Sequence, residues 1–443
     1  MAAKSGFIFF VTHLVPYPPV RGIELRMFKL LSWLRAEGYR VILMLPVEFI
    51  DSHTLQELRK IVYEVHWTRP ALGTRLGRRL PYLRQKIWEP LKPYLRPAPI
   101  QHQLDATNPQ HGHDSVGSHQ KKAELCPDSL VDLVAKLARR YRPQALIAEY
   151  IFMTPCFANL PADTLRILDT EDLFSRKRDQ VLAFGIADPY ACTEDEERQH
   201  LLRADLIVAI QGREAEMLKN LVPERKVILT PIDFATADNV PVNNEDSNIV
   251  LVIGADNELN IHGLRAFLKE CWPEIKTAHP AARLHVVGKV GAKCRIDDQS
   301  IQYTPRVDDL TEVYREARVA INPTIAGTGL KIKSAEALAH GKPLVAWPNG
   351  VEGLDYSGEP PFIECRSWHE FGSAVVRLLR SDSDAKTLAN RALSYARAQF
   401  NAPKVYASLR ACLLEHASQN HEAGLANDPV RVTYQGQTTW SDS

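Results

Sequence analysis

Short apolar runs rich in β-branched and aromatic residues alternate along the chain with stretches that have helical periodicity. The first apolar run covers residues 7–11, and after it Met27, Leu30 and Leu34 recur at intervals of three and four, as on one face of a helix. Further runs before position 235 lie at 41–45, 61–65, 145–150, 166–170, 206–210 and 226–230. Buried strands that alternate with helices predict βαβ units and a parallel sheet.

A second series of the same kind follows residues 235–247, which are polar, lack periodicity and are interpreted as a linker. Its apolar runs lie at 248–254, 283–288, 318–323, 343–348 and 361–365. Two parallel-sheet units joined by a short linker predict two Rossmann-like domains that face each other. We expect ligands in the cleft between them, at the carboxyl ends of the strands.

These patterns divide the chain into an N-terminal domain over 1–240 and a C-terminal domain over 248–395. An insertion at about 69–129 interrupts the first domain, and its second part is polar and has no apolar period. We expect a helix at 396–420 to return to the N-terminal domain. The polar tail at 421–443 is expected to be disordered.

Composition excludes several classes of protein. The chain has 443 residues, 45% of them hydrophobic and 24% charged, which excludes a wholly disordered, collagen-like or coiled-coil chain. Because 54 Lys and Arg face 53 Asp and Glu, no global field favours a nucleic-acid partner. Seven scattered cysteines, with no Cys-x-x-Cys pair, indicate a reducing compartment and no zinc site. No run of 18 apolar residues predicts a membrane span, so we expect a cytoplasmic protein.

Residues 69–96 are locally basic, with eight cations against one anion and with Leu, Tyr and Trp between them. This composition is typical of a segment that lies on an anionic lipid surface, and it predicts peripheral contact with the inner membrane face. A helical hairpin packed on the domain, with a solvated basic face, explains the composition equally well. Four prolines limit any helix here to short pieces.

The stretch 323–355 concentrates the residue types that bind phosphate. Gly327 and Gly329 lie between the end of a predicted strand and a helix that begins near Lys333. Bare backbone N–H groups and a helix N-terminus hold a phosphate in this geometry, and Lys331 and Lys333 add positive charge beside the loop. The glycine pair, the two lysines and the helix in this order indicate a phosphate site more strongly than a glycine pair alone.

Two carboxylates accompany this loop. Glu336 falls in the first turns of the predicted helix, where it can hold the two hydroxyls of a ribose or simply favour the helix dipole. Glu352 lies in a glycine-flanked turn at the carboxyl end of the next predicted strand.

The block 323–355 resembles the donor-site region of family 4 glycosyltransferases, in a subgroup that reads roughly G-x-G-x-K-x-K-x-x-E-A-x-A-x-G-x-P-x-V. Residues 257–288 and 307–323 resemble the same subgroup, and 16–41 is similar to the family's N-terminal P-x-P…G-G segment. The resemblance covers most of the chain outside the insertion and the tail. It implies an α/β protein with the GT-B fold, in which two Rossmann-like domains face each other across a cleft.

The resemblance also implies an activity, the retaining transfer of a sugar from a nucleotide diphosphate sugar to a glycan, a lipid-linked intermediate or a small molecule. No metal or other cofactor is obligatory. Cations and backbone donors aimed at the phosphates stabilise the leaving nucleotide as negative charge develops, which makes Lys331 and Lys333 catalytic candidates. Glu336 matches the second Glu of the family's Glu-x7-Glu pair, which family members use on the ribose. The predicted donor set is Gly254, Gly327, Thr328, Gly329, Leu330, Lys331, Lys333, Glu336 and Glu352.

The chain departs from the family pattern at two places. Thr328 stands where the first Glu of the pair is expected, and the usual Arg and Lys after the first strand of the second domain are missing. Lys331 or Lys333 can take over the phosphate role. A non-catalytic scaffold, or a nucleotide-sugar epimerase or phosphorylase of the same fold, therefore stays an alternative.

Candidates in the N-terminal domain face the acceptor. Gly22 matches one glycine of the family's acceptor-side loop, or is simply a turn glycine, and Arg26 is either a ligand for an anionic acceptor or a solvated side chain. Glu171 and Asp172 occupy the loop that faces the sugar in family members, and either can orient the acceptor hydroxyl. A helix N-cap is the alternative for Asp172. Glu149, on the preceding strand, is a weaker acceptor-side candidate.

Overall fold

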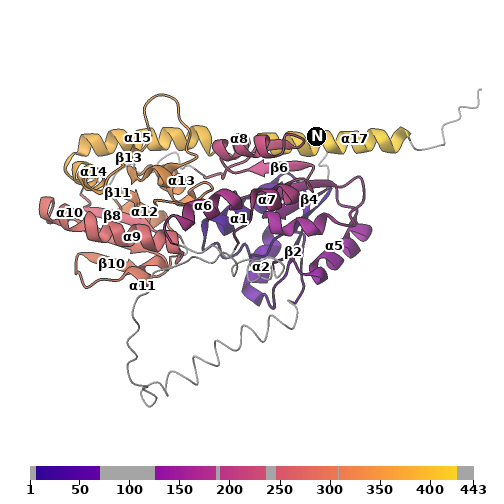
Figure 1. The fold of residues 1–443 in the computed structure, drawn as a ribbon, viewed down its shortest axis with the longest axis horizontal. Coiled ribbons are helices and arrows are strands. Elements are labelled where there is room, and N and C mark those ends of the chain that lie inside the picture. The colour runs from indigo at the N-terminus through magenta and orange to yellow at the C-terminus, as the bar shows by residue number, and fades with distance from the viewer. Residues whose placement is uncertain (1–5, 70–124, 186–189, 236–245, 308, 427–443) are drawn as a thin grey trace, which may run out of the picture.

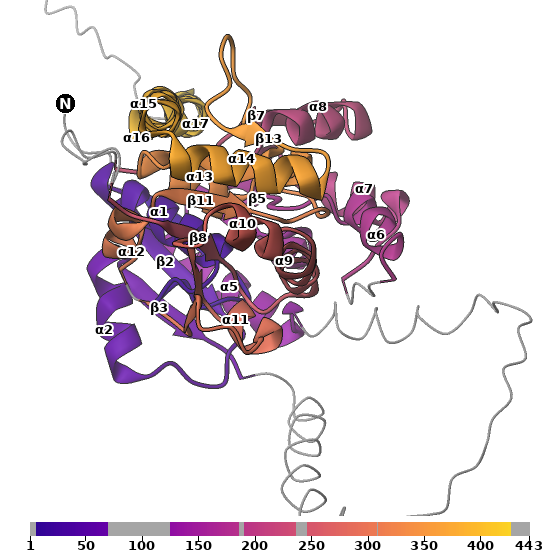
Figure 2. The same cartoon turned by 90° about the vertical axis from the view of Figure 1, so that its left-hand side faces the viewer.

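The computed structural model describes residues 6–69, 125–185, 190–235, 246–307 and 309–426. Within them the chain forms two α/β domains, each built on a parallel sheet with helices on both faces (Figure 1; Figure 2). The predicted fold class is confirmed. Most of the basic segment and of the insertion lies outside the described residues, so the membrane contact stays a prediction. No helix in the described part of the chain is long and apolar enough to cross a bilayer.

The N-terminal sheet has seven parallel strands in the order β3-β2-β1-β4-β5-β6-β7. They are β1 (Phe7–Val11), β2 (Arg40–Leu45), β3 (Glu64–Trp67), β4 (Ala145–Glu149), β5 (Leu165–Asp169), β6 (Leu206–Ala209) and β7 (Lys226–Leu229). Helices cover both of its faces. They are α1 (Gly22–Ala36), α2 (Ser52–Ile61), α5 (Asp128–Tyr141), η2 (Ile151–Phe157), α6 (Phe174–Leu182), α7 (Glu194–Leu201) and α8 (Gly212–Leu221).

The predicted strand at 61–65 was wrong in its first half. Residue 61 is the last of α2, whose N-terminus is capped by the Asp51 carboxylate accepting from the Thr54 N–H at 2.9 Å. Strand β3 starts only at Glu64 and lies at the edge of the sheet, where the side chains are half exposed. An edge strand is partly exposed to solvent, so it has few consecutive apolar residues. The sequence pattern alone therefore does not mark where α2 ends and β3 begins.

The C-terminal sheet has six parallel strands in the order β10-β9-β8-β11-β12-β13. They are β8 (Ile249–Ile253), β9 (Arg283–Val287), β10 (Ile301–Thr304), β11 (Val319–Asn322), β12 (Leu344–Ala346) and β13 (Ile363–Glu364). The helices around it are α9 (Glu258–Glu270), α10 (Trp272–Ala278), α11 (Val290–Cys294), α12 (Thr311–Glu316), α13 (Ile332–Ala339), η3 (Pro348–Val351), α14 (Trp368–Arg380) and α15 (Asp382–Gln399). Edge strand β10 was not predicted, because only its first residue is buried.

Each sheet is buried on both faces, because successive side chains of a strand point to opposite sides. In β1, Phe9 packs toward α5 and η2, whereas Phe10 packs toward α1 and α2. In β8, Val250 and Leu251 divide in the same way between two apolar clusters. These strands therefore read as continuous apolar runs.

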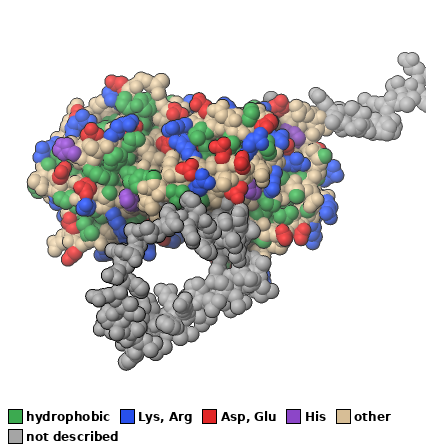
Figure 3. Space-filling view, viewed as in Figure 1, with side chains coloured by type: hydrophobic (Ala, Val, Ile, Leu, Met, Phe, Trp, Pro, Cys, Tyr) green, Lys and Arg blue, Asp and Glu red, His purple; other side chains and the backbone are tan. Residues whose placement is uncertain are grey.

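The chain returns to the N-terminal domain at its C-terminal end. After α16 (Ala402–Val405), helix α17 (Ala407–Ala426) lies against the N-terminal domain and runs past the predicted boundary at 420 (Figure 1). Tyr406 stacks on Trp33 of α1 at a ring distance of 4.4 Å, and Leu409 and Leu413 join the same apolar cluster as α1. On the face in Figure 3, cations and anions are interspersed, in keeping with the balanced composition.

Candidate functional site

The loop between β11 and α13 takes its shape from two glycines. Gly327 and Gly329 have φ values of +113° and +74°, in the region that residues with a side chain rarely adopt. A Cβ on Gly329 would lie 2.7 Å from the backbone oxygen of Glu171 in the N-terminal domain. The glycine spacing therefore serves both the turn and a close approach between the domains. Gly327 and Gly329 direct their N–H groups toward side chains of the N-terminal domain.

Lys331 holds the loop from the inside. Its ammonium group donates to the carbonyl oxygens of Gly327, Thr328 and Gly329 at 3.3, 2.9 and 3.0 Å. Because these carbonyls converge on one cation, the loop keeps the conformation in which its N–H groups face the other domain. Burial lowers the pKa of Lys331, an effect that nearby Asp172 opposes. Its predicted direct contact with a phosphate stays a prediction.

Lys333 lies at the start of α13, and its hydrogen-bond partners among the described residues are neutral. Its ammonium group donates to Oδ1 of Asn260 at 2.7 Å and to Oγ1 of Thr324 at 2.8 Å. Burial, followed by the charge of Lys331, lowers the pKa of Lys333 to about 7. A buried ammonium without an anion is well suited to receive one, because an approaching phosphate would restore its ordinary pKa.

Glu336 lies one turn further along α13. Its Oε2 accepts a bond from the Tyr314 hydroxyl at 3.3 Å, and burial raises the pKa of Glu336 to about 7. Two other predicted donor residues, Leu330 and Gly254, pack within the C-terminal domain. Leu330 is buried in the same apolar cluster as α13, and Gly254 directly follows β8, where its carbonyl accepts from the Val290 N–H at 3.2 Å.

Side chains of the N-terminal domain contact the loop directly. The Thr328 hydroxyl donates to Oδ1 of Asp172 at 2.9 Å, and the other oxygen of Asp172 is 2.9 Å from Nζ of Lys177. Asp172 is therefore an interdomain contact. Glu352, from the C-terminal domain, pairs with Arg176 at 3.0 Å and with Arg213 at 3.3 Å. Predicted residues of the two domains are thus brought together by direct contacts.

Gly22 also serves the contact between the domains. It is the first residue of α1, and a Cβ at this position would lie 2.9 Å from Cβ of Ile332, the first residue of α13. The absence of a side chain lets the two helices meet at their N-termini. Its predicted acceptor role stays a prediction.

Arg26 is buried, which corrects the interpretation of a solvated side chain, whereas its role as a ligand for an anionic acceptor stays a prediction. It is 1% exposed, and its Nη1 contacts the carboxylates of Asp169, at 2.6 Å, and of Glu171. Its remaining donors reach the backbone oxygens of Pro231 at 3.0 Å and Thr230 at 2.8 Å. These partners hold all of its polar groups inside the domain.

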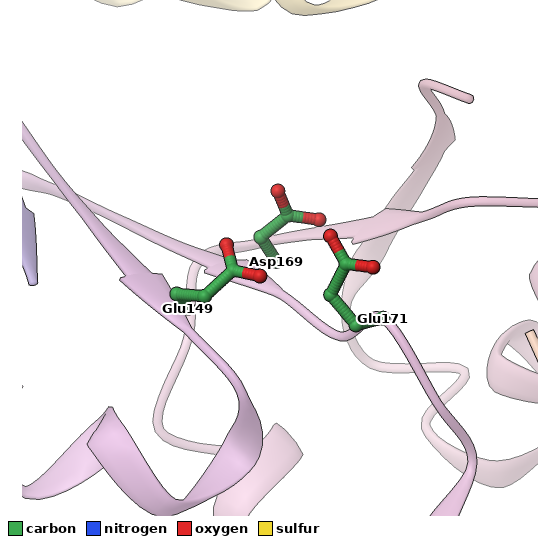
Figure 4. Close-up of side chains that lie close together, drawn as sticks. All are labelled: Glu149, Asp169 and Glu171. Atoms are coloured by element: carbon green, nitrogen blue, oxygen red, sulfur yellow. The ribbon is translucent and has the colours of Figure 1, made fainter. Parts of the chain in front are cut away.

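Three carboxyl groups, two of which contact this guanidinium, lie close together; Figure 4 shows the three carboxyl groups. Glu149 and Asp169 end the adjacent strands β4 and β5, Glu171 follows in the loop after β5, and their oxygens lie within 4.8 Å of one another. Burial raises the pKa of Glu149 well above its ordinary range, and the charges of Glu171 and Asp169 add to this shift. Burial also raises the pKa of Glu171 to about 7. The spacing would suit a cation, and the guanidinium of Arg26 is the cation that lies there.

A protonated Glu149 accounts for the geometry of this cluster. Neither oxygen of Glu149 has a hydrogen-bond partner within the described part of the chain, although the side chain is fully buried. A protonated carboxyl can donate to Glu171, which lies beside it. Burial therefore favours the protonated form of Glu149.

We expect Glu149→Gln to stabilise the protein at high pH. The folded-state pKa of Glu149 is raised, so the stability associated with its protonated form is present below about pH 4.5 and lost as pH rises through the folded-state value. Gln keeps a donor for Glu171 and cannot ionise. The variant should gain on the order of 1–2 kcal/mol over the wild type at pH 8 and little at pH 5. Urea unfolding at both pH values measures this, and an equal effect at both would contradict a buried proton.

Sequence reasoning missed two polar residues that contact the loop, and a third polar residue, His13, whose ring nitrogen is buried. Gln180 on α6 and Glu214 on α8 contact the loop, and their helical positions carry no signal that separates them from solvated residues. His13 follows β1, and its Nδ1 is buried without a partner among the described residues. Burial, and then the charge of Arg21, lower the pKa of His13 to about 4. A polar residue directly after the first strand was the available signal.

Two Rossmann-like domains, each with a parallel sheet, define the GT-B class of fold. A loop with two glycines of positive φ and basic residues lies where the two domains meet. Residues 247–381 match the model of the family "Glycosyl transferases group 1". This match comprises most of the C-terminal domain and includes the loop, Lys331, Lys333 and Glu336. It supports assignment of the C-terminal part to a glycosyltransferase domain; the finer subgroup pattern is a separate prediction.

Solved structures of the same fold cover nearly the whole chain. Sucrose-phosphate synthase from Thermosynechococcus elongatus has a TM-score of 0.59 and 15% identity, over 95% of this chain and 100% of that one. A TarM variant of S. aureus, in complex with fondaparinux, α-GlcNAc-glycerol and UDP, has a TM-score of 0.63 and 9% identity, over 92% and 99%. Anabaena Alr3699/HepE in complex with UDP and glucose has a TM-score of 0.58 and 12% identity, over 95% and 100%. At these identities the likeness establishes the fold.

One curated relative is similar in sequence, an uncharacterized 44.6 kDa protein in the cps region of Klebsiella pneumoniae. It is 22% identical over 163 residues, which are 34% of this chain. The match spans 42% of that relative's length.

Proposed function

We propose that this chain is a glycosyltransferase that transfers a sugar from a nucleoside diphosphate sugar to a hydroxyl group of an acceptor, with retention of the anomeric configuration. The observation that carries the proposal is the loop before α13. Two glycines with positive φ direct their N–H groups out of the loop, beside a helix N-terminus and a lysine that has no anionic partner among the described residues, within a segment that matches a glycosyltransferase family.

The chemistry needs each of these groups. As the bond between the sugar and the diphosphate breaks, negative charge builds up on the leaving phosphate, and donors aimed at it lower the barrier. The N–H groups of Gly327 and Gly329, together with Lys333, supply such donors. Lys331 keeps the loop in shape through its carbonyls. In this proposal Glu336 accepts from the ribose hydroxyls, and the UDP in the HepE and TarM structures supports a nucleotide as the bound group.

The acceptor is proposed to approach from the N-terminal domain. Asp172 follows β5 and accepts from the Thr328 hydroxyl, so its carboxylate can orient an acceptor hydroxyl toward the sugar. Glu171, whose carboxylate contacts Arg26, is the second candidate for this role. A glycan or lipid-linked acceptor is consistent with the α-GlcNAc-glycerol in the TarM complex and with the cps-region relative. Contact of residues 69–96 with an anionic membrane belongs to the same proposal.

Calorimetric titration with UDP, GDP and ADP and with their sugar conjugates tests this function. We expect one nucleoside diphosphate to bind with a micromolar dissociation constant, and its sugar conjugate to release the nucleotide when an acceptor is added. Product configuration is measured by NMR. Absence of binding to every nucleotide would contradict the donor site, whereas binding without release across varied acceptors would favour the non-catalytic scaffold.

A further inference from the structure

The N–H groups of the donor loop already have partners from the opposite domain. The Gly327 N–H donates to Oε1 of Gln180 on α6 at 2.9 Å. The Gly329 N–H donates to Oε1 of Glu214 on α8 at 2.7 Å. Two side chains of the N-terminal domain therefore occupy the two donors that the proposed function gives to a phosphate.

Glu214 is in an environment that does not favour a carboxylate. It is fully buried, and its Oε2 has no hydrogen-bond partner within the described residues. Burial and the charge of Asp172 raise the pKa of Glu214 to about 8, against the Gly329 N–H and Lys331, which lower it. An incompletely paired acidic group in the interior costs free energy, so this contact is one that a better acceptor can replace.

The competition follows from the donor geometry. Each N–H carries one hydrogen, and a phosphate oxygen within hydrogen-bond distance of the Gly329 nitrogen would lie where Oε1 of Glu214 now lies. We propose that Glu214 and Gln180 form an autoinhibitory contact, in which they close the donor loop against the N-terminal domain and must be displaced before a nucleoside diphosphate binds. This inference rests on the proposed function.

Removal of either side chain should therefore tighten nucleotide binding. A neutral hydrogen bond contributes little net free energy, so we expect a roughly three- to tenfold lower dissociation constant for Glu214→Ala and for Gln180→Ala, and a larger decrease for the double variant. If either residue instead supported the donor site, its removal would raise the dissociation constant. The matched control is Glu216→Ala, which removes an exposed glutamate from the same helix and should leave the dissociation constant unchanged.

The experiment is calorimetric titration of UDP, GDP and ADP into the full-length wild type and these variants, combined with hydrogen exchange at Gly327 and Gly329. We expect faster exchange of the corresponding amide in each variant and tighter binding of the nucleotide that the wild type prefers. Unchanged or weaker binding in both single variants would overturn the autoinhibitory contact. If neither the wild type nor any variant bound a nucleotide while exchange still rose in the variants, the proposed function would be wrong and the contact would only join the domains. If Glu214→Ala does not fold, Gln180→Ala tests the autoinhibitory contact on its own.

Discussion

Replacement of Arg26 by Met should lower the free energy of unfolding by about 3–5 kcal/mol, because loss of one partner leaves buried charges uncompensated. The guanidinium is 1% exposed and contacts Asp169 and Glu171, while Glu149 lies against the same two carboxyl groups. It also joins α1 to the backbone after β7 through Thr230. Met fills a similar volume but returns none of these interactions.

Urea unfolding at pH 7, followed by circular dichroism, measures this loss. The matched control is Arg35→Met, which removes an exposed arginine from the same helix and should change stability by less than about 0.5 kcal/mol. The double variant Arg26→Met with Glu171→Gln should recover part of the loss, since one fewer carboxyl must be kept neutral. A loss no larger than that of Arg35→Met would show that the cluster does not depend on its cation.

The fold was predictable because parallel sheets buried on both faces produce continuous apolar runs. The runs at 7–11 and 206–210 coincide with β1 and β6 within a residue. Prediction failed where burial is one-sided, as in β3 and β10 at the sheet edges. There the local pattern resembles a helix end or a loop, and only pairing with a neighbouring strand decides the structure.

The site was predictable only in part. Glycines with positive φ and a following helix leave a local signature, which is why Gly327 and Gly329 could be identified. The burial of Arg26 had a weaker signal, since the residue is four positions before Leu30 and therefore lies on the apolar face of α1. Gln180 and Glu214 had none, because their partners are backbone groups more than a hundred residues away. Contacts between domains depend on tertiary structure that no local pattern encodes.

Replacement of Lys333 by Met should weaken nucleotide binding about 10- to 100-fold, the effect of losing a charge-assisted hydrogen bond of about 1.5–3 kcal/mol. Its present partners, Asn260 and Thr324, are neutral, so the variant loses no ion pair and should keep its fold. Lys269→Met is the matched control, because Lys269 is exposed on α9 and should not affect binding. Equal affinities of wild type and Lys333→Met for the preferred nucleotide would place the phosphates elsewhere.

The pH dependence of binding distinguishes an ammonium that contacts phosphate from one that only packs. The pKa of Lys333 is about 7, and a bound diphosphate would raise it, so the contribution of Lys333 to affinity is present below pH 7 and is lost as pH rises through the bound-state pKa. Nucleotide binding at pH 8 should therefore take up a large fraction of one proton. Lys333→Arg, which stays charged at this pH, should show correspondingly less uptake. Titrations at pH 8 in buffers of different ionisation enthalpy measure this difference in proton uptake.

Glu336 and Glu214 also titrate near neutral pH, and they do so in both proteins. Only the difference in proton uptake between the wild type and Lys333→Arg therefore reports Lys333. Equal uptake by the two proteins would exclude its contact with the phosphates.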